Sequence, residues 1–237
     1  MKAMLNKKRI AAGQESAWGR FCRQYGHIFP LIIYGIFYIL CFAYLESKPM
    51  RNMHLIHMAV DDYIPFCEYF IIPYFLWFGY VAATVVFFFF RDKSDYYRLC
   101  TFLFTGMTIF LAVSAIYPNG HLLRPVLAGR EDTIFIRMVR FLYRTDTATN
   151  LFPSIHVYNS LATHFAITNS SYFENKKWIR TGSLILCISI ILSTVFLKQH
   201  SMFDVLTAFG LAAFMHFAVY RRAAVAYPQT AEARPRF

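Results

Sequence analysis

The sequence predicts an all-α integral membrane protein built as a bundle of six transmembrane helices. Of its 237 residues, 57% are hydrophobic and 19% aromatic, while only 16% are charged. A soluble domain carries about 25% charged residues. The apolar residues also gather in long runs, each close to the ~20 residues that a helix needs to cross the hydrocarbon core. Helices satisfy their backbone hydrogen bonds within such a segment, so a helical bundle follows.

The expected spans are, in chain order, residues 28–45, 63–90, 99–117, 153–168, 178–197 and 201–220. The second is long enough to be tilted, and the fourth is short and polar on one side. The expected domains are a basic cytoplasmic segment over 1–27, a six-helix transmembrane domain over 28–220 and a cytoplasmic tail over 221–237. The first run lacks a signal-peptide cleavage pattern, so we expect a retained anchor.

Charge distribution sets the expected orientation. The formal net charge is +11, which in a membrane protein favours anionic membrane lipids as partners over nucleic acid. With the N-terminus inside, the inner segments hold 16 of the 24 Lys and Arg residues and the outer segments hold 8. We therefore expect a multi-pass cell-membrane protein with both termini cytoplasmic.

The expected outer loop 118–152 runs against this bias, because five arginines lie within it. Long loops can cross the membrane despite their charge, which is one reading. The other reading is that the loop binds an anion. The five cysteines form no C-x-x-C pair and lie mostly in or beside apolar runs, so we interpret them as small hydrophobic residues.

Two local patterns carry candidate chemistry at the expected outer helix ends. Pro153-Ser154-Ile155-His156 opens the fourth run, where free backbone N–H groups and the helix dipole favour an anion beside Ser154. His200 and Asp204 are four residues apart, so on a helix they share a face. A carboxylate that holds one imidazole nitrogen leaves the other free as a nucleophile or base. Taken alone, such a pair is also compatible with a structural hydrogen bond.

Two cations belong to the same expected layer. Arg124 follows the third run and has the planar fork that suits phosphate oxygens, and Lys198 precedes His200. Two histidines, one aspartate and these cations supply what phosphoryl transfer requires.

These residues resemble the type 2 phosphatidic acid phosphatase superfamily, whose motifs are K-x6-R-P, P-S-x-H and S-R-x5-H-x3-D. The second motif is intact at residues 153–156, the third reads Ser193-Thr194, five residues, His200, three residues, Asp204, and the first keeps Arg124-Pro125. Tyr117 stands in place of the motif's lysine and Thr194 in place of its arginine. Residues that could replace the two cations are Lys198, His121, Arg140 and Arg144.

The resemblance implies a role for each matching residue. His200 attacks phosphorus and becomes a phosphohistidine, Asp204 orients it, and His156 protonates the leaving alkoxide. Arg124 and Ser154 hold the phosphate, with no metal and no other cofactor. The implied activity is a phosphatase for a phosphatidic-acid-like or isoprenoid phosphate, with its active site facing outward at the ends of the third to sixth spans. An alternative is a head-group phosphotransferase of the sphingomyelin or inositol phosphorylceramide synthase type, since those branches also relax the cationic positions.

Other residues permit further readings. Glu68, like His121 and Arg144, is a candidate for substrate binding, and a structural carboxylate is its other reading. His54 and His57 could form a metal pair but have no third ligand nearby. A non-enzymatic lipid or anion transporter would use the same cationic pocket. The polar groups gather at one end, however, whereas carrier sites lie near the midplane.

Overall fold

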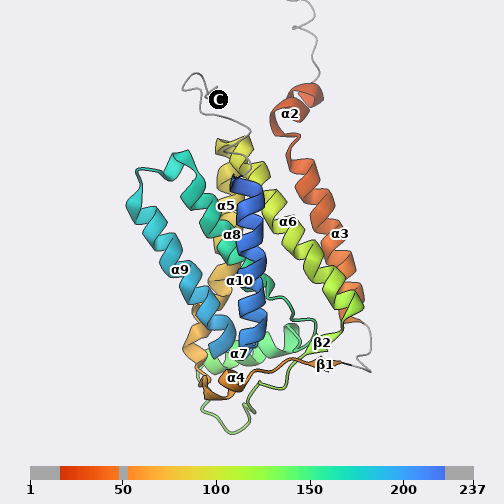
Figure 1. The fold of residues 1–237 in the computed structure, drawn as a ribbon, viewed down its shortest axis with the longest axis vertical. Helices are drawn as coiled ribbons and strands as arrows, with labels where there is room; N and C mark the ends of the chain where they lie inside the picture. Colours follow the sequence, from red (N-terminus) through yellow and green to blue (C-terminus); the bar gives the residue numbers. More distant parts are fainter. Residues whose placement is uncertain (1–16, 48–52, 222–237) are drawn as a thin grey trace, which may run out of the picture. The chain divides into compact units, whose positions relative to one another are not determined.

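The computed structural model describes residues 17–47 and 53–221 (Figure 1). Contacts divide the chain into two compact units, one reaching to Phe37 and one beginning at Tyr38. In the first unit the described residues form α2 (Ala17–Tyr25) and the first part of α3 (Ile28–Glu46). Residues 1–16 of the expected N-terminal segment and 222–237 of the expected tail lie outside the described residues.

The second unit is helical over its described part, apart from one pair of two-residue strands. Its elements after α3 are β1 (His54–Leu55), α4 (Ala59–Tyr63), η1 (Glu68–Phe70), α5 (Ile71–Arg91), α6 (Lys93–Ile116), β2 (Asn119–Gly120), α7 (Ile134–Thr145), α8 (Ile155–Asn169), η2 (Ser171–Phe173), α9 (Lys177–Phe196), α10 (Met202–His216) and the π-helical turn η3 (Phe217–Arg221). The two strands pair in parallel, with His54 opposite Asn119. The all-α prediction is confirmed.

Within residues 17–47 and 53–221, five helical segments are long and apolar enough to cross a membrane: Ile28–Glu46, Glu68–Arg91, Lys93–Ile116, Lys177–Phe196 and Met202–Tyr220. They coincide with five of the six expected spans and indicate a multi-pass membrane protein. The remaining expected span, the fourth (residues 153–168), corresponds to α8, whose 15 residues extend about 22 Å, short of a ~30 Å hydrocarbon core.

Burial of α8 explains why its sequence is less apolar than that of the other spans. It packs against α5, α6, α9 and α10 and lies among them in the bundle (Figure 1). Most of its side chains are buried, including polar ones such as Asn159 and Thr163. Because neighbouring helices shield α8 from lipid, its surface does not need to be uniformly apolar.

Two expected boundaries are corrected, one by local capping and one by proline. Helix α6 begins six residues before the expected Leu99, because the Asp92 side chain accepts a hydrogen bond from the Asp95 N–H and caps a polar first turn. The second span begins at Glu68 and not at Tyr63, since Pro65 separates α4 from η1.

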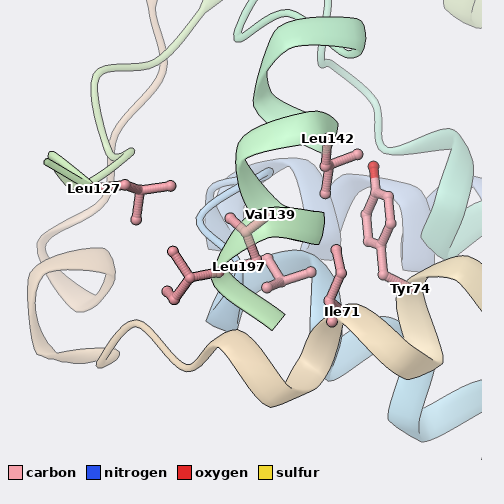
Figure 2. Close-up of a cluster of buried hydrophobic side chains, with 7 residues drawn as sticks. Ile71, Tyr74, Leu127, Val139, Leu142 and Leu197 are labelled. Carbon is pink, nitrogen blue, oxygen red and sulfur yellow. The ribbon is translucent and has the colours of Figure 1, made fainter. Parts of the chain in front are cut away.

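Helix α7 was not expected, because its residues fell within the outer loop 118–152. Thr133 caps it by accepting from the Ile136 N–H, and Ile136, Val139 and Leu142 form its buried face. These three residues join Ile71 and Tyr74 of α5, together with Leu127 and Leu197, in one hydrophobic cluster (Figure 2). This cluster fixes α7 against the turn that follows α9.

Helices α6 and α8 pack closely against each other at Gly106. A Cβ atom added to Gly106 would come within 2.0 Å of the Tyr158 ring, whose hydroxyl donates to the Phe102 carbonyl at 2.8 Å. We therefore expect Gly106→Ala to force α8 away from α6. The expected loss is about 1–3 kcal/mol of stability, measured as a lower thermal unfolding midpoint in detergent.

Gly210→Ala is the matched control, since a Cβ there meets no atom within 4 Å. Alanine is a better helix former than glycine, so this variant should be neutral or slightly stabilising. Equal midpoints for the two variants would contradict the packing described for α6 and α8.

Candidate functional site

The turn between α9 and α10 positions His200. Helix α9 ends at Phe196, and Lys198 has a φ of 52°, a left-handed conformation that reverses the chain direction. The N–H groups of Gln199 and His200 then donate to the Thr194 carbonyl at 2.9 and 3.0 Å. The His200 backbone is therefore fixed by the last turn of the preceding helix.

The beginning of α10 holds the His200 imidazole. Ser201 is the N-cap, and Asp204 completes a capping box by accepting from the Ser201 N–H at 3.0 Å. The same Asp204 Oδ2 atom lies 3.4 Å from His200 Nδ1. Because the carboxylate faces Nδ1, Nε2 is the nitrogen of His200 left for chemistry. Both side chains are buried.

His156 comes from the first turn of α8. The helix begins at Ile155 with Ser154 as N-cap, so Pro153 precedes the cap and does not occupy the expected first turn. The Ser154 N–H donates to the Asp204 carbonyl at 3.4 Å, which ties the start of α8 to the start of α10. The His156 and His200 ring centroids are 5.7 Å apart.

Aromatic side chains of α5 enclose His156 on its other side. Its ring centroid lies 4.7 Å from that of Tyr74 and 4.4 Å from that of Trp77. Nδ1 of His156 is buried and has no hydrogen-bond partner among the described residues. A buried polar atom without a partner is costly, so this nitrogen is a natural contact for a ligand.

The segment that leads into α8 is fixed by Asn119, which is fully buried. Its side-chain carbonyl accepts from the N–H groups of Leu151 and Phe152 at 2.8 and 3.0 Å. Asn150 has a φ of 53° and donates through its side chain to Glu46 of α3 at 2.8 Å. These contacts set the direction in which the chain enters the helix that carries His156.

Arg124 lies at the same end of the bundle, but its guanidinium group already donates hydrogen bonds to other groups of the protein. Its Nη1 donates to the Tyr143 carbonyl at 3.2 Å, and its Nη2 donates to the carbonyls of Asp146 and Thr147 at 2.8 and 3.0 Å and to the Gln199 side chain. Burial lowers the pKa of Arg124, although a guanidinium stays charged at neutral pH. It can therefore add positive charge to the site but has few free donors.

A carboxylate that sequence analysis did not single out lies beside Arg124. The Tyr74 hydroxyl donates to Asp146 Oδ2 at 2.8 Å, across 72 positions of sequence. Burial raises the pKa of Asp146, while the charges of His200 and Arg124 act in the opposite direction. Asp146 thus lies within electrostatic range of His200.

His121 is bound through both ring nitrogens. Nε2 donates to the Gln199 carbonyl at 2.8 Å, and Nδ1 accepts from the Leu123 N–H at 3.2 Å. This pattern requires the neutral ring, and burial lowers its pKa to about 4. In this structure His121 therefore supports the backbone beside His200 and adds no positive charge. Its expected contact with substrate stays a prediction.

Lys198 belongs to a set of hydrogen bonds on both sides of His200, made by Asp61 with Lys198, Ser201 and Met202 and called the clamp below. Its Nζ donates to the Asp61 carbonyl at 2.6 Å, and burial lowers its pKa. The Asp61 carboxylate accepts from the Ser201 hydroxyl at 2.5 Å and from the Met202 N–H at 2.8 Å. Asp61 therefore contacts the chain on both sides of His200. Binding of phosphate by Lys198 stays a prediction, since its ammonium has this partner.

Three sequence candidates remain, namely Arg144, Arg140 and Glu68. Arg144 is exposed in the last turn of α7, and Arg140 binds Asp132 at 2.6 Å. Glu68 begins η1, whose preceding residue Cys67 donates its N–H to the Phe196 carbonyl at 3.0 Å, so it lies near the end of α9.

The two positions that depart from the family motifs are held by structural contacts. The Tyr117 ring stacks on His54 with centroids 4.0 Å apart, and the Thr194 hydroxyl donates to the Ile191 carbonyl at 2.7 Å. His57 lies 2.9 Å from Asp62, which raises its pKa. Over residues 17–47 and 53–221, no group of three or more His, Cys, Asp or Glu side chains is arranged to hold a metal ion.

Comparison with protein families agrees with this geometry. Residues 132–227 match the model of the PAP2 superfamily, a stretch that includes Ser154, His156, His200 and Asp204. The chain carries a PAP2 superfamily domain. This confirms the resemblance inferred from the motifs. The match begins after Arg124, so it does not include the remnant of the first motif. Curated proteins and solved structures give no match to the chain.

Sequence analysis missed four contributors to this site, namely Asp61, Tyr74, Asp146 and Gln199. Their contacts join distant parts of the chain, as in the contact of Asp61 with Ser201 across 140 positions and that of Arg124 with Gln199 across 75. The acidic pair Asp61-Asp62 and the polar segment after Arg144 were visible in the sequence, but neither has a motif that predicts its partner.

The clamp generates a stability prediction. Asp61→Ala removes the acceptor of two buried donors at the start of α10, and each unpaired donor costs about 1–3 kcal/mol. We expect a clearly lower thermal unfolding midpoint in detergent. Asp62→Ala is the control, because the Asp62 side chain is 65% exposed and pairs only with His57 among the described residues. A loss of stability no larger for Asp61→Ala than for Asp62→Ala would disprove the clamp.

Proposed function

We propose that this protein is a membrane-bound, metal-independent enzyme that breaks the P–O ester bond of a lipid phosphate through a phosphohistidine at His200. The observation that carries the proposal is the placement of two buried imidazoles with centroids 5.7 Å apart, one of them held by a carboxylate. PAP2 superfamily membership supports a phosphatase or phosphotransferase. The separation is short enough for both rings to contact one phosphoryl group.

In the first half of the proposed reaction, His200 Nε2 attacks phosphorus. The P–N bond forms as the P–O bond to the lipid breaks, and the departing alkoxide takes a proton from His156. Asp204 accepts the hydrogen bond of His200 Nδ1 and stabilises the positive charge that the ring acquires.

In the second half, His156 acts as the base. It takes a proton from water or from an alcohol, whose oxygen attacks phosphorus, and the P–N bond breaks to release His200. His156 ends protonated, as it began. With water as acceptor the enzyme is a phosphatase for a phosphatidic-acid-like or isoprenoid phosphate, which is the simplest form because it needs no second substrate.

Transfer to an alcohol is the second form, and one specific observation favours it. Tyr117 and Thr194 replace two cations of the family motifs, and the donors of Arg124 are largely bound to main-chain carbonyls. In both forms we assign phosphate contacts to Arg124, to Ser154 and to Lys198, once its ammonium leaves the Asp61 carbonyl. Arg144, His121 and Glu68 remain candidates for head-group contacts.

We further propose that this end of the bundle faces the outside of the cell membrane, with both termini cytoplasmic. The proposal is supported by the 16-to-8 division of basic residues between inner and outer segments. The partners proposed on this basis are a lipid phosphate and the anionic membrane lipids.

The division of labour between the two histidines can be tested with purified protein, lipid phosphates and EDTA in the buffer. The wild type should release phosphate from a lipid phosphate and from an activated aryl phosphate. His156→Ala should slow cleavage of the lipid phosphate by about 10²–10⁴-fold, because the alkoxide of the lipid leaves poorly without a proton. The activity of His156→Ala on the aryl phosphate should fall much less, because that leaving group needs little protonation.

His164→Ala provides a matched control on the same helix, since the His164 side chain binds Ser183 and not the site. It should retain both activities. Equal losses for the two substrates in His156→Ala would contradict its role as general acid. Complete dependence on a divalent ion would contradict the proposed reaction as a whole.

A further inference from the structure

Asp146 introduces a negative charge where a phosphate substrate is expected to bind. It follows α7, and its carboxylate is held by the Tyr74 hydroxyl at 2.8 Å. The Tyr74 ring lies 4.7 Å from the His156 ring, so the pair borders the histidine that handles the leaving group. Oδ1 of Asp146 accepts no hydrogen bond from the described residues.

The positive charge available to balance this carboxylate is small. Arg124 is the cation beside Asp146, and it donates to the main-chain carbonyl of Asp146 itself at 2.8 Å. Lys198 is bound at Asp61, and positions 117 and 194 carry no charge. The charge of Arg124 is therefore offset by that of Asp146 before any substrate arrives.

The opposing charges of Arg124 and Asp146 affect which substrate charge the site favours. A phosphomonoester carries about −1.5 to −2 charges at pH 7, because its second pKa is near 6. A phosphodiester carries a single negative charge. The repulsion between Asp146 and a doubly charged phosphate is strongest in a buried, poorly solvated site.

We propose that Asp146, oriented by Tyr74, makes the site selective for a phosphate with a single negative charge, and thus for a phosphodiester lipid over a phosphomonoester lipid. The inference rests on the proposed function and selects between its two forms. With a diester, His200 Nε2 bonds to phosphorus, one P–O ester bond breaks, and its alkoxide takes a proton from His156. The second ester bond is retained throughout. An acceptor hydroxyl gives its proton to His156, its oxygen attacks phosphorus, and the P–N bond breaks to release His200.

A pair of lipids that differ by one methyl group tests the inference. Phosphatidic acid is the monoester, and phosphatidylmethanol is the diester of the same diacylglycerol. Cleavage of the bond to glycerol releases diacylglycerol from both, so one assay with the same leaving group measures both kcat/KM values. The wild type should cleave phosphatidylmethanol with the higher kcat/KM. Asp146→Asn should shift the diester-to-monoester ratio of kcat/KM at least about tenfold toward the monoester.

Two further variants separate charge from structure. Tyr74→Phe removes the hydroxyl that holds Asp146 but leaves its charge, so it should retain the preference for the diester. Asp132→Asn removes an exposed carboxylate bound to Arg140 and should leave the ratio unchanged. The wild-type comparison needs no variant. A wild type that cleaves phosphatidic acid as fast as phosphatidylmethanol, or an unchanged ratio in Asp146→Asn, would overturn this inference alone. Release of diacylglycerol from either lipid by His200→Ala would instead overturn the proposed function.

Discussion

The rest of the site depends on the turn between α9 and α10. This turn must hold Nδ1 of His200 against Asp204 and leave Nε2 free for the substrate. Thr194 fixes the turn from the preceding helix, Ser201 and Asp204 fix it from the following helix, and Asp61 contacts it on both sides of His200. These groups are buried, so their hydrogen bonds are hard to replace with water. The position of His200 is thus set by three separate segments of chain. The bundle around α8 then brings His156 to the facing position.

The electrostatic balance of the site differs from what its motifs alone would imply. The motifs predict a pocket in which cations surround a phosphate. In the structure, His121 is bound as a neutral ring, Lys198 contacts a carbonyl, and Arg124 holds together the segment after α7. The added carboxylate of Asp146 reduces the positive charge further. In the proposed reaction, the histidine chemistry and the handling of phosphate charge depend on different residues, so variation in the second can change the substrate while the first is retained.

Sequence patterns predicted those parts of the structure that depend on local periodicity and on caps. The runs of apolar residues located α3, α9 and α10 closely, and the four-residue spacing of His200 and Asp204 predicted their approach. Local patterns failed where burial by other helices changes which residue types a helix can carry. Helix α8 is shorter and more polar than a lipid-facing helix because its neighbours surround it, and α7 was hidden in a basic loop. Contacts such as Tyr74 with Asp146 join distant parts of the chain, and no single-sequence pattern predicts them.

In the proposed reaction His200 forms a covalent bond to phosphorus, and direct detection of that bond is the most direct test. The purified protein would be mixed with a phosphorus-labelled lipid phosphate, quenched with alkali within the first turnover and digested for mass spectrometry. We expect an acid-labile, base-stable phosphoryl group on the peptide that contains His200, and none in His200→Ala. Label on another residue, or undiminished label in His200→Ala, would contradict it.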